Sequence, residues 1–330
     1  MGKEQCITRH YHNMFEVSSM IQKSIRRQDY DHAYYAANEL IPKYRNYLWK
    51  RLLTVSAEDC FDLVTHKVVE YRKKDDETSD KRYIALAVST LLNARKNRDA
   101  DYFACNLFNS RDEADITKYV AHPVKDLSCS TKNGHCMFDL EKVFNAAIQA
   151  HDDVMAGYAA NELRVYYPKF TWRMIIKLAD KFNLPAISEE IRALREAYEE
   201  TERTSIIFYS KALTILLKVV KRGNDDFYQK DYPCKCVDLG LFDKKYFAIP
   251  AYVFDVHTLR GKFMHKTRMD FIIEEQAALK PHVDGDYDNA SWEHSFWLEK
   301  NGYYRNEYTP HPDKKRVAEL EEGVRQQSLF

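Results

Sequence analysis

Cations alternate with aromatic rings in two stretches of this sequence, residues 43–51 and 166–173. Phosphates bind cations and bases stack on flat rings, so this pattern suits single-stranded nucleic acid. The candidate contact residues of the two stretches are Lys50, Arg51, Lys169 and Arg173. A structural interpretation competes with this one. Trp49 and Trp172 occupy corresponding positions and would then be core anchors surrounded by solvated charges, because Trp buries a large area.

A third stretch, Asp255–Arg268, concentrates positive charge near a predicted helix start, with Thr258 as the N-cap. The free N–H groups of a helix start favour anions. The candidate phosphate-binding residues there are Arg260, Lys262, Lys266 and Arg268. One alternative is an amphipathic helix with a basic outer face. The other is a metal-dependent enzyme that uses Asp255, His257 and His265, although this spacing is a weak metal signature.

Two smaller groups also carry potential chemistry. Glu58 and Asp59 form a carboxylate pair suited to acid–base work or to a divalent ion. Their place in Ser56-Ala-Glu-Asp59 favours a helix start, where acidic groups complement the helix dipole. The second group contains the thiols and the imidazole that a zinc site would need: Cys129, His135, Cys136, Cys234 and Cys236. Its spacing is not that of a zinc ribbon, which favours ordinary thiols and leaves zinc open. We expect no resident metal or cofactor.

An internal duplication organises the elements that hold these residues. Ala-Ala-Asn-Glu-Leu occurs at 36–40 and again at 159–163, and the surrounding positions match at one offset of 123 residues. Trp49 and Trp172 are one such pair. After a shift of two residues the match continues to about residue 228. A register held over about 90 residues predicts a doubled domain rather than a repeat array.

Composition bounds the class of protein. The chain has 330 residues, 45% of them apolar, which predicts a globular protein with a large core. Lys plus Arg and Asp plus Glu are both 50, so any nucleic-acid contact must come from a local patch. The seven cysteines and the absence of an apolar leader predict reduced thiols and a cytoplasmic location. No apolar run is long enough to span a membrane.

Apolar spacing predicts an all-α fold in four parts: a first helical domain over 1–110, a linker over 111–137, a second helical domain over 138–230, and a mostly helical C-terminal module over 231–330. The first domain has one helix that stops before Pro42 and another over Tyr47–Val55. In the C-terminal module, Thr258–Leu279 is expected to form one helix with a basic start. Lys314–Gln326 is expected to form a charged terminal helix.

The stretch Lys23–Leu40 resembles the helical C-terminal region of the RarA/MgsA (Werner-helicase-interacting) AAA+ ATPases, relatives of clamp loaders. Two further motifs support the resemblance. Ser56-Ala-Glu-Asp59 stands where that family has Ala-Ser-Glu-Asp, and Ala94–Asp101 looks like its Ala-Pro-Lys-Ser element. The match covers about residues 15–105 and, more faintly, the second copy. It implies a collar-like bundle that mediates oligomerisation in DNA replication or recombination.

The sequence departs from that family at the site of catalysis. No Gly-x-x-x-x-Gly-Lys-Ser/Thr occurs in the chain, so the nucleotide-cradling loop is missing. The expected function is therefore a non-catalytic scaffold or accessory protein of DNA replication or recombination. Its expected partners are DNA, with single-stranded DNA as one form, a replication or recombination protein such as an AAA+ ATPase, and further copies of itself. The alternatives are a pure protein–protein scaffold and the metal-dependent enzyme mentioned above.

Overall fold

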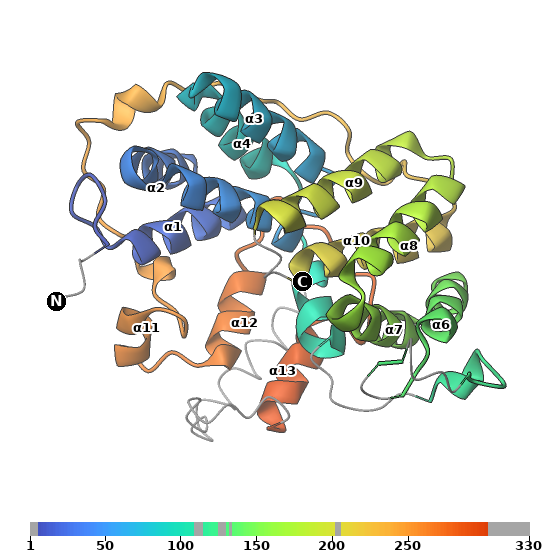
Figure 1. Cartoon of the computed structure of the whole chain (residues 1–330). Helices are drawn as coiled ribbons and strands as arrows, with labels where there is room; N and C mark the ends of the chain where they lie inside the picture. The colour runs from blue at the N-terminus through green and yellow to red at the C-terminus, as the bar shows by residue number, and fades with distance from the viewer. Residues whose placement is uncertain (1–5, 109–114, 125–129, 132–133, 202–205, 303–330) are drawn as a thin grey trace, which may run out of the picture.

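The computed structural model describes residues 6–108, 115–124, 130–131, 134–201 and 206–302, and within them the chain is helical (Figure 1). β pairing in these residues is limited to isolated bridges. The all-α prediction is therefore confirmed. In the part of the chain that is described, no helix combines the length and apolar character needed to cross a bilayer. The predicted helix Lys314–Gln326 lies outside the described residues.

The first half of the chain contains five α-helices, and a turn of π-helix follows the last of them. They are α1 (Met14–Arg27), α2 (Tyr30–Glu58), α3 (Thr65–Thr78), α4 (Lys81–Asn93), α5 (Asp99–Phe103) and the π-helix Ala104–Phe108. α1 packs along α2, and α4 covers α2 and α3 (Figure 1). The Ala36–Leu40 stretch is buried: its alanines and Leu40 belong to the apolar core, Asn38 donates to Asp243, and Glu39 bonds Thr8 and His10.

The second half follows after a 3-10 turn, Ile116–Lys118. Its helices are α6 (Met137–Gln149), α7 (Asp153–Tyr166), α8 (Pro168–Lys181), α9 (Pro185–Glu200) and α10 (Ile207–Arg222). α10 is the most buried helix, as its apolar sequence predicts, and packs against α2, α5, α6, α7, α8 and α9. One continuous apolar core therefore spans both halves.

Local backbone geometry recurs between the halves at the 123-residue offset. Gln28 and His151 adopt left-handed conformations with φ of 53° and 55°. Each precedes an aspartate, Asp29 or Asp152, whose side chain accepts a backbone N–H at the start of the next helix. An αL residue followed by an Asp N-cap is a compact way to end one helix and begin another.

The next pair at this offset lies where the following helix bends. Tyr44 and Tyr167 have φ of −130° and −133°, both outside the helical range. Their hydroxyls donate to the carbonyls of Ile7 and Ser130 at 3.2 and 3.4 Å, which again differ by 123 residues. In the first half the helix continues through this bend as α2, whereas in the second half the bend separates α7 from α8.

Three sequence expectations about helix limits were wrong. α2 does not stop before Pro42 but bends at Tyr44 and continues to Glu58, so the predicted helix Tyr47–Val55 is its second part. Ser56–Asp59 ends α2 instead of starting the next helix, and α3 begins only at Thr65. The late start of α3 depends on tertiary structure, because a residue of another helix caps its first turn.

That cap is Glu190 of α9. Its buried carboxylate accepts the backbone N–H groups of Thr65 and His66 at 2.9 and 3.0 Å and contacts His66 Nδ1 at 2.8 Å. Burial raises the pKa of Glu190, but the hydrogen bonds and charge of His66 outweigh it and hold this pKa below its ordinary value. Burial lowers the pKa of His66, but Glu190 outweighs it and raises this pKa.

We expect Glu190→Gln to lower the free energy of unfolding by about 2 kcal/mol, because the amide cannot accept all three bonds. The stabilising effect of Glu190 is lost as the pH falls through its depressed pKa, and that of His66 is lost as the pH rises through its raised pKa. The loss of unfolding free energy caused by Glu190→Gln should therefore be largest between about pH 4.5 and 6.5. Urea unfolding across this range measures it, with exposed Glu189→Gln as the matched control. An equal loss in both variants would contradict the capping role.

The C-terminal part begins with residues 224–256, which we call the strap. It contains two short 3-10 turns, Leu239–Phe242 and Ala251–Val253, and runs across the first half (Figure 1). Asn38 donates to Asp243 of the strap at 3.0 Å, and the rings of Tyr35 and Phe247 lie 4.8 Å apart. The strap therefore covers α2 and brings the chain back to the N-terminal helix α1.

Three short helices follow the strap: α11 (Leu259–Phe263), α12 (Arg268–Gln276) and α13 (Trp292–Lys300). The single helix expected over 258–279 is wrong, because the chain breaks at His265, where φ is 57°. Thr267 and Asp270 then form a reciprocal capping box that starts α12. This box takes the place of continued helix, since it satisfies the first N–H groups of α12.

Candidate functional site

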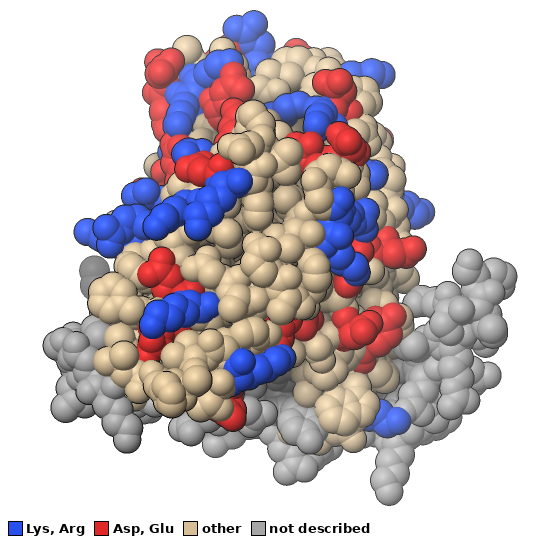
Figure 2. All heavy atoms as spheres, turned by 90° about the vertical axis from the view of Figure 1, so that its right-hand side faces the viewer, with Lys and Arg blue, Asp and Glu red and all other residues tan. Residues whose placement is uncertain are grey.

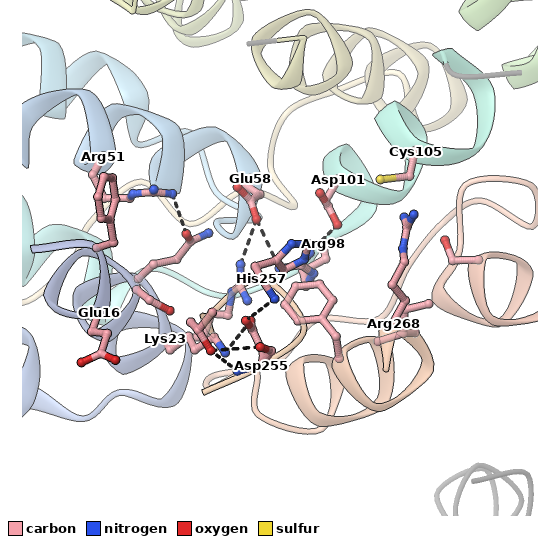
Figure 3. A pocket seen from close by; sticks show the side chains of 18 of the residues that line it. Glu16, Lys23, Arg51, Glu58, Arg98, Asp101, Cys105, Asp255, His257 and Arg268 are labelled. Carbon is pink, nitrogen blue, oxygen red and sulfur yellow. Dashed lines mark hydrogen bonds and ion pairs between the residues drawn. The ribbon is translucent and has the colours of Figure 1, made fainter. Parts of the chain in front are cut away.

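A cleft of about 620 Å³ opens where the two ends of the described chain meet, and we call it the central cleft (Figure 3). α1 and the second part of α2 form one wall. α5, α12 and α13 form the other, and the residues between the strap and α11 close one side. Sequence segments more than 200 residues apart therefore contribute to one cavity.

The floor of the central cleft is a buried ion cluster. It comprises the cations Lys23, Arg26, Arg27 and Arg98 and the carboxylates Glu58, Asp59, Asp101, Asp255 and Glu275. Charges buried to this degree are tolerated only when they are paired and hydrogen-bonded. The three motifs that carry the family resemblance each contribute to this cluster.

Arg26 is the centre of the cluster. Its Nη2, Nε and Nη1 atoms lie 2.8, 2.7 and 2.8 Å from carboxylate oxygens of Glu58, Asp59 and Glu275. Burial and the neighbouring Arg98 lower the pKa of Arg26, but the three carboxylates outweigh them and raise it above its ordinary value. Arg26 therefore joins α1, the end of α2 and α12.

Lys23 and Arg98 extend the cluster to both sides. Lys23 Nζ lies 2.7 Å from Asp255 and 3.2 Å from Glu275, and it also donates to the carbonyls of residues 252 and 253. Arg98 Nη1 lies 3.1 Å from Asp59, and Arg98 also pairs with Asp101. Its guanidinium lies 5.4 Å from the ring centroid of Phe271, a cation–π distance.

Glu58 is the member of the cluster whose charge is least stabilised. Four cations face five carboxylates, which leaves one carboxylate in excess. Burial, then the nearby charges of Asp59 and Asp101, raise the pKa of Glu58 to about 7, although Arg26 and Arg98 oppose the shift. Glu58 therefore binds a proton in the neutral pH range, whereas an ordinary glutamate does not.

We expect carbon-detected NMR of the glutamate side chains to show one carboxyl that titrates near pH 7 and disappears in Glu58→Gln. A carboxyl group whose pKa is raised in the folded state favours folding most at a pH below its unfolded pKa. This effect is lost as the pH rises to the folded pKa. The variant should therefore be stabilised relative to the native chain as the pH rises from about 4.5 to 7. Glu16→Gln, at the rim of the same cleft, is the control. No glutamate titrating above pH 6 would contradict the assignment.

The structure places the predicted nucleic-acid residues at three separate locations. Arg51 and Arg268 line the central cleft. Lys169 and Arg173 lie on α8, and Arg260 and Lys262 lie on α11. Lys50, on α2, is half-buried.

Carboxylates or rings engage several of these cations. Lys266 pairs with Glu274, and Arg268 Nε lies 2.8 Å from Glu299. The guanidinium of Arg260 lies 4.5 Å from the ring centroid of Phe254. The predicted helix is broken after the five residues of α11, so these four cations do not lie on one helix.

α8 carries a row of cations that sequence reasoning found only in part. Lys169, Arg173, Lys177 and Lys181 are spaced by four residues and all are exposed. Helical geometry places successive members about 6 Å apart along the axis. None of the four forms an ion pair with a described carboxylate, and the nearby Asp180 is held at 2.8 and 2.9 Å by Arg192. The signal in the sequence was the four-residue spacing from Lys169.

Aromatic rings lie at the N-terminal end of this row. The rings of Phe138 and Phe170 are 6.4 Å apart in an edge-to-face arrangement, and Arg173 lies 5.8 Å from the Phe170 ring centroid. Tyr166 is exposed beside them. Figure 2 shows the side of the molecule on which α6 and α8 lie, where Lys and Arg gather in patches among acidic and uncharged residues.

The opposite face of α8 is core. Trp172 is 3% exposed and stacks on Tyr209 with ring centroids 4.4 Å apart, and Trp49 of α2 is fully buried. The structural interpretation of both tryptophans is therefore confirmed. Their buried rings are not exposed for base stacking, whereas Lys169 and Arg173 beside Trp172 are exposed.

The proposed metal ligands that the structure describes do not form one cluster. Asp255 pairs with Lys23, and His257 packs edge-to-face on Phe271. Cys234 contacts Thr90 of α4, whereas Cys136 precedes α6, and Cys129 lies outside the described residues. Among the residues that the structure describes, no group of three or more His, Cys, Asp or Glu side chains is placed to hold an ion.

No protein-family model, curated protein or solved structure matches this chain.

Proposed function

We propose that this chain is a non-catalytic helical scaffold of DNA replication or recombination that binds single-stranded nucleic acid along α8. The row of Lys169, Arg173, Lys177 and Lys181 is the observation that carries the proposal. Cations about 6 Å apart along an exposed helix can follow a phosphate backbone. The rings of Phe138, Tyr166 and Phe170 lie at one end, where bases can stack.

The duplication itself supports assigning a function to this row. The positions of the first half that correspond to the four cations at an offset of 123 are Asn46, Lys50, Thr54 and Glu58. The buried anchor Trp49 recurs as Trp172, but the row of cations does not recur. Packing alone therefore does not require the row, which belongs to the second half only.

We also propose that the two halves descend from one ancestral bundle of the RarA/MgsA collar type. The left-handed residues, the Asp N-caps and the bent tyrosines at one offset support common descent. The meeting of the three resemblance motifs in the buried ion cluster supports the family relation. Under this proposal the chain is cytoplasmic, forms oligomers and cooperates with a motor ATPase, since it has no nucleotide-cradling loop itself.

The test is a titration of the intact protein with a fluorescent single-stranded oligonucleotide at several salt concentrations, beside multi-angle light scattering. The proposal predicts binding that weakens steeply with salt, because phosphate contacts release counterions. It also predicts a mass above that of the monomer. A stable oligomer without salt-sensitive affinity would favour the pure protein scaffold instead.

A further inference from the structure

The central cleft has the size and the lining of a small-molecule site. Its volume of about 620 Å³ is within the range of typical ligand pockets. Residues of α1, α2, α5, α11, α12 and α13, of the π-helix and of the segments before α1, α5 and α11 line it. Its floor is fixed by the ion cluster (Figure 3). Because each carboxylate of that floor pairs with at least one cation, the floor is a poor site for a metal ion or a polycation.

The walls provide aromatic surface. Phe15 is 60% exposed at the mouth, and Tyr47 of α2 lines the same cleft. Two rings in the lining of one cleft give a flat ligand surfaces on which to stack. Tyr102 and Phe271 continue this lining deeper in the cleft, where Arg98 lies within 5.6 and 5.4 Å of their ring centroids.

Arg51 is a cation of the cleft that has more N–H donors than its two side-chain hydrogen bonds use. Arg51 Nε donates to Ser18 Oγ and Nη1 donates to Gln22 Oε1, both at 3.0 Å. These two bonds orient the guanidinium, as Figure 3 shows for its bond to Gln22. Arg51 forms no ion pair with the described carboxylates, and a guanidinium has five N–H donors in a fork that matches a phosphate.

We propose that the central cleft binds one nucleotide unit, with its base against Phe15 and Tyr47 and its phosphate on Arg51. Gln22 and Glu58 also line the cleft, but both are engaged: Gln22 bonds Arg51 and Asp59, and Glu58 accepts from Arg26 and Arg98. We therefore assign them no contact with the base. A free mononucleotide and the end of a DNA strand share this chemistry of base and phosphate. This proposal rests on the proposed function and extends it. It depends on α1 and α2 rather than on α8, so the cleft proposal and the α8 proposal can be refuted separately.

The chain offers a matched pair of positions for the test. Phe15 and Phe138 differ by 123 residues and are 60% and 54% exposed, but only Phe15 lines the central cleft. Phe15→Trp and Phe138→Trp therefore place the same fluorophore at corresponding sites with and without the cleft. Stacking of a base on Trp quenches its fluorescence.

The experiment titrates full-length Phe15→Trp with dAMP, deoxyadenosine and a 5′-phosphorylated oligonucleotide. We expect saturable quenching by dAMP or by the oligonucleotide. In Phe138→Trp, whose ring belongs to the proposed α8 interface, we expect no saturable quenching by dAMP, because a single phosphate cannot engage the row of four cations that would hold a strand there. Saturation by dAMP identifies a free nucleotide as the ligand, and saturation by the oligonucleotide alone identifies a strand end. Adding Arg51→Gln should lower the affinity for the phosphorylated ligand about tenfold and leave the affinity for deoxyadenosine unchanged.

Two results would overturn the proposal: no saturable quenching of Phe15→Trp by either phosphorylated ligand at millimolar concentration, or unchanged affinity after Arg51→Gln. Circular dichroism of each variant establishes that the fold is retained. Removal of the α8 cations should leave dAMP binding intact, which separates a failure of the cleft from a failure of the α8 interface.

Discussion

Reversing the charge of the α8 row should abolish most of the affinity for single-stranded DNA. The variant combines Lys169→Glu, Arg173→Glu, Lys177→Glu and Lys181→Glu. Each phosphate contact contributes about 0.7 to the slope of log affinity against log salt for single strands. Four lost contacts should therefore flatten this slope by about 3 and lower the affinity at least ~100-fold near 0.05 M salt.

The control for this prediction reverses four exposed cations of the first half and the strap. These are Arg82, Lys235, Lys244 and Lys245. The change in net charge is the same, so a general electrostatic effect would weaken both variants equally. Fluorescence anisotropy with a labelled oligonucleotide measures the affinities. Equal losses in the two variants would show that the α8 row is not the interface.

The second large effect is expected from Arg26→Met, which should lower the free energy of unfolding by about 3 to 5 kcal/mol. The reason is that Glu58, Asp59 and Glu275 all lose a cation at 2.7–2.8 Å, and two of these carboxylates are fully buried. Each carboxylate then keeps only contacts of 3.1–3.4 Å with other cations, so its buried charge is poorly compensated, which costs more than the pair contributes. Urea unfolding followed by circular dichroism at pH 7 measures the change.

The pH dependence of this loss follows from Glu275. Burial raises its pKa, but Arg26, Lys23 and Arg27 outweigh it and hold the pKa well below its ordinary value. The carboxylate therefore stabilises the fold above its unfolded pKa and loses this effect as the pH falls. The difference in the free energy of unfolding between the native chain and Arg26→Met should become smaller below about pH 4.

Arg27→Met is the matched control for Arg26→Met. Arg27 is the next residue and also contacts Glu275, at 3.1 Å, but its side chain is 18% exposed and makes fewer ion pairs. We expect a loss of about 1 kcal/mol, as for partly solvated pairs. A similar loss for both arginines would mean that the cluster contributes as a diffuse surface network and not through the buried geometry of Arg26.

Helical periodicity was readable from the sequence because it depends on local chemistry, whereas the internal duplication stays a prediction. Apolar spacing predicted an all-α chain, and the described residues are helical. The interpretation of Trp49 and Trp172 as core residues is confirmed by their burial. A large apolar ring at two corresponding positions is most simply explained by packing. The four-residue spacing of α8 was also visible, although only Lys169 and Arg173 were identified.

Helix limits were less accessible, because they depend on groups far away in the sequence. α3 begins at Thr65 because Glu190, 125 residues later, accepts its first N–H groups. The motif around Ser56 satisfies the local rule for a helix start, but its carboxylates instead meet Arg26 and Arg98. A local rule cannot anticipate a partner supplied by another helix.

The sequence by itself determined that this chain is helical, and it identified Lys169 and Arg173, two of the four exposed cations of α8, since the spacing of residues along a helix is a local property. Only the tertiary structure decided that α1, α2, α5 and α12 meet around Arg26, because the strap returns the chain to its first helix. The central cleft exists for the same reason. Ion pairs over more than 200 residues, such as Arg26 with Glu275, follow from how helices pack and leave no periodic signal in the chain.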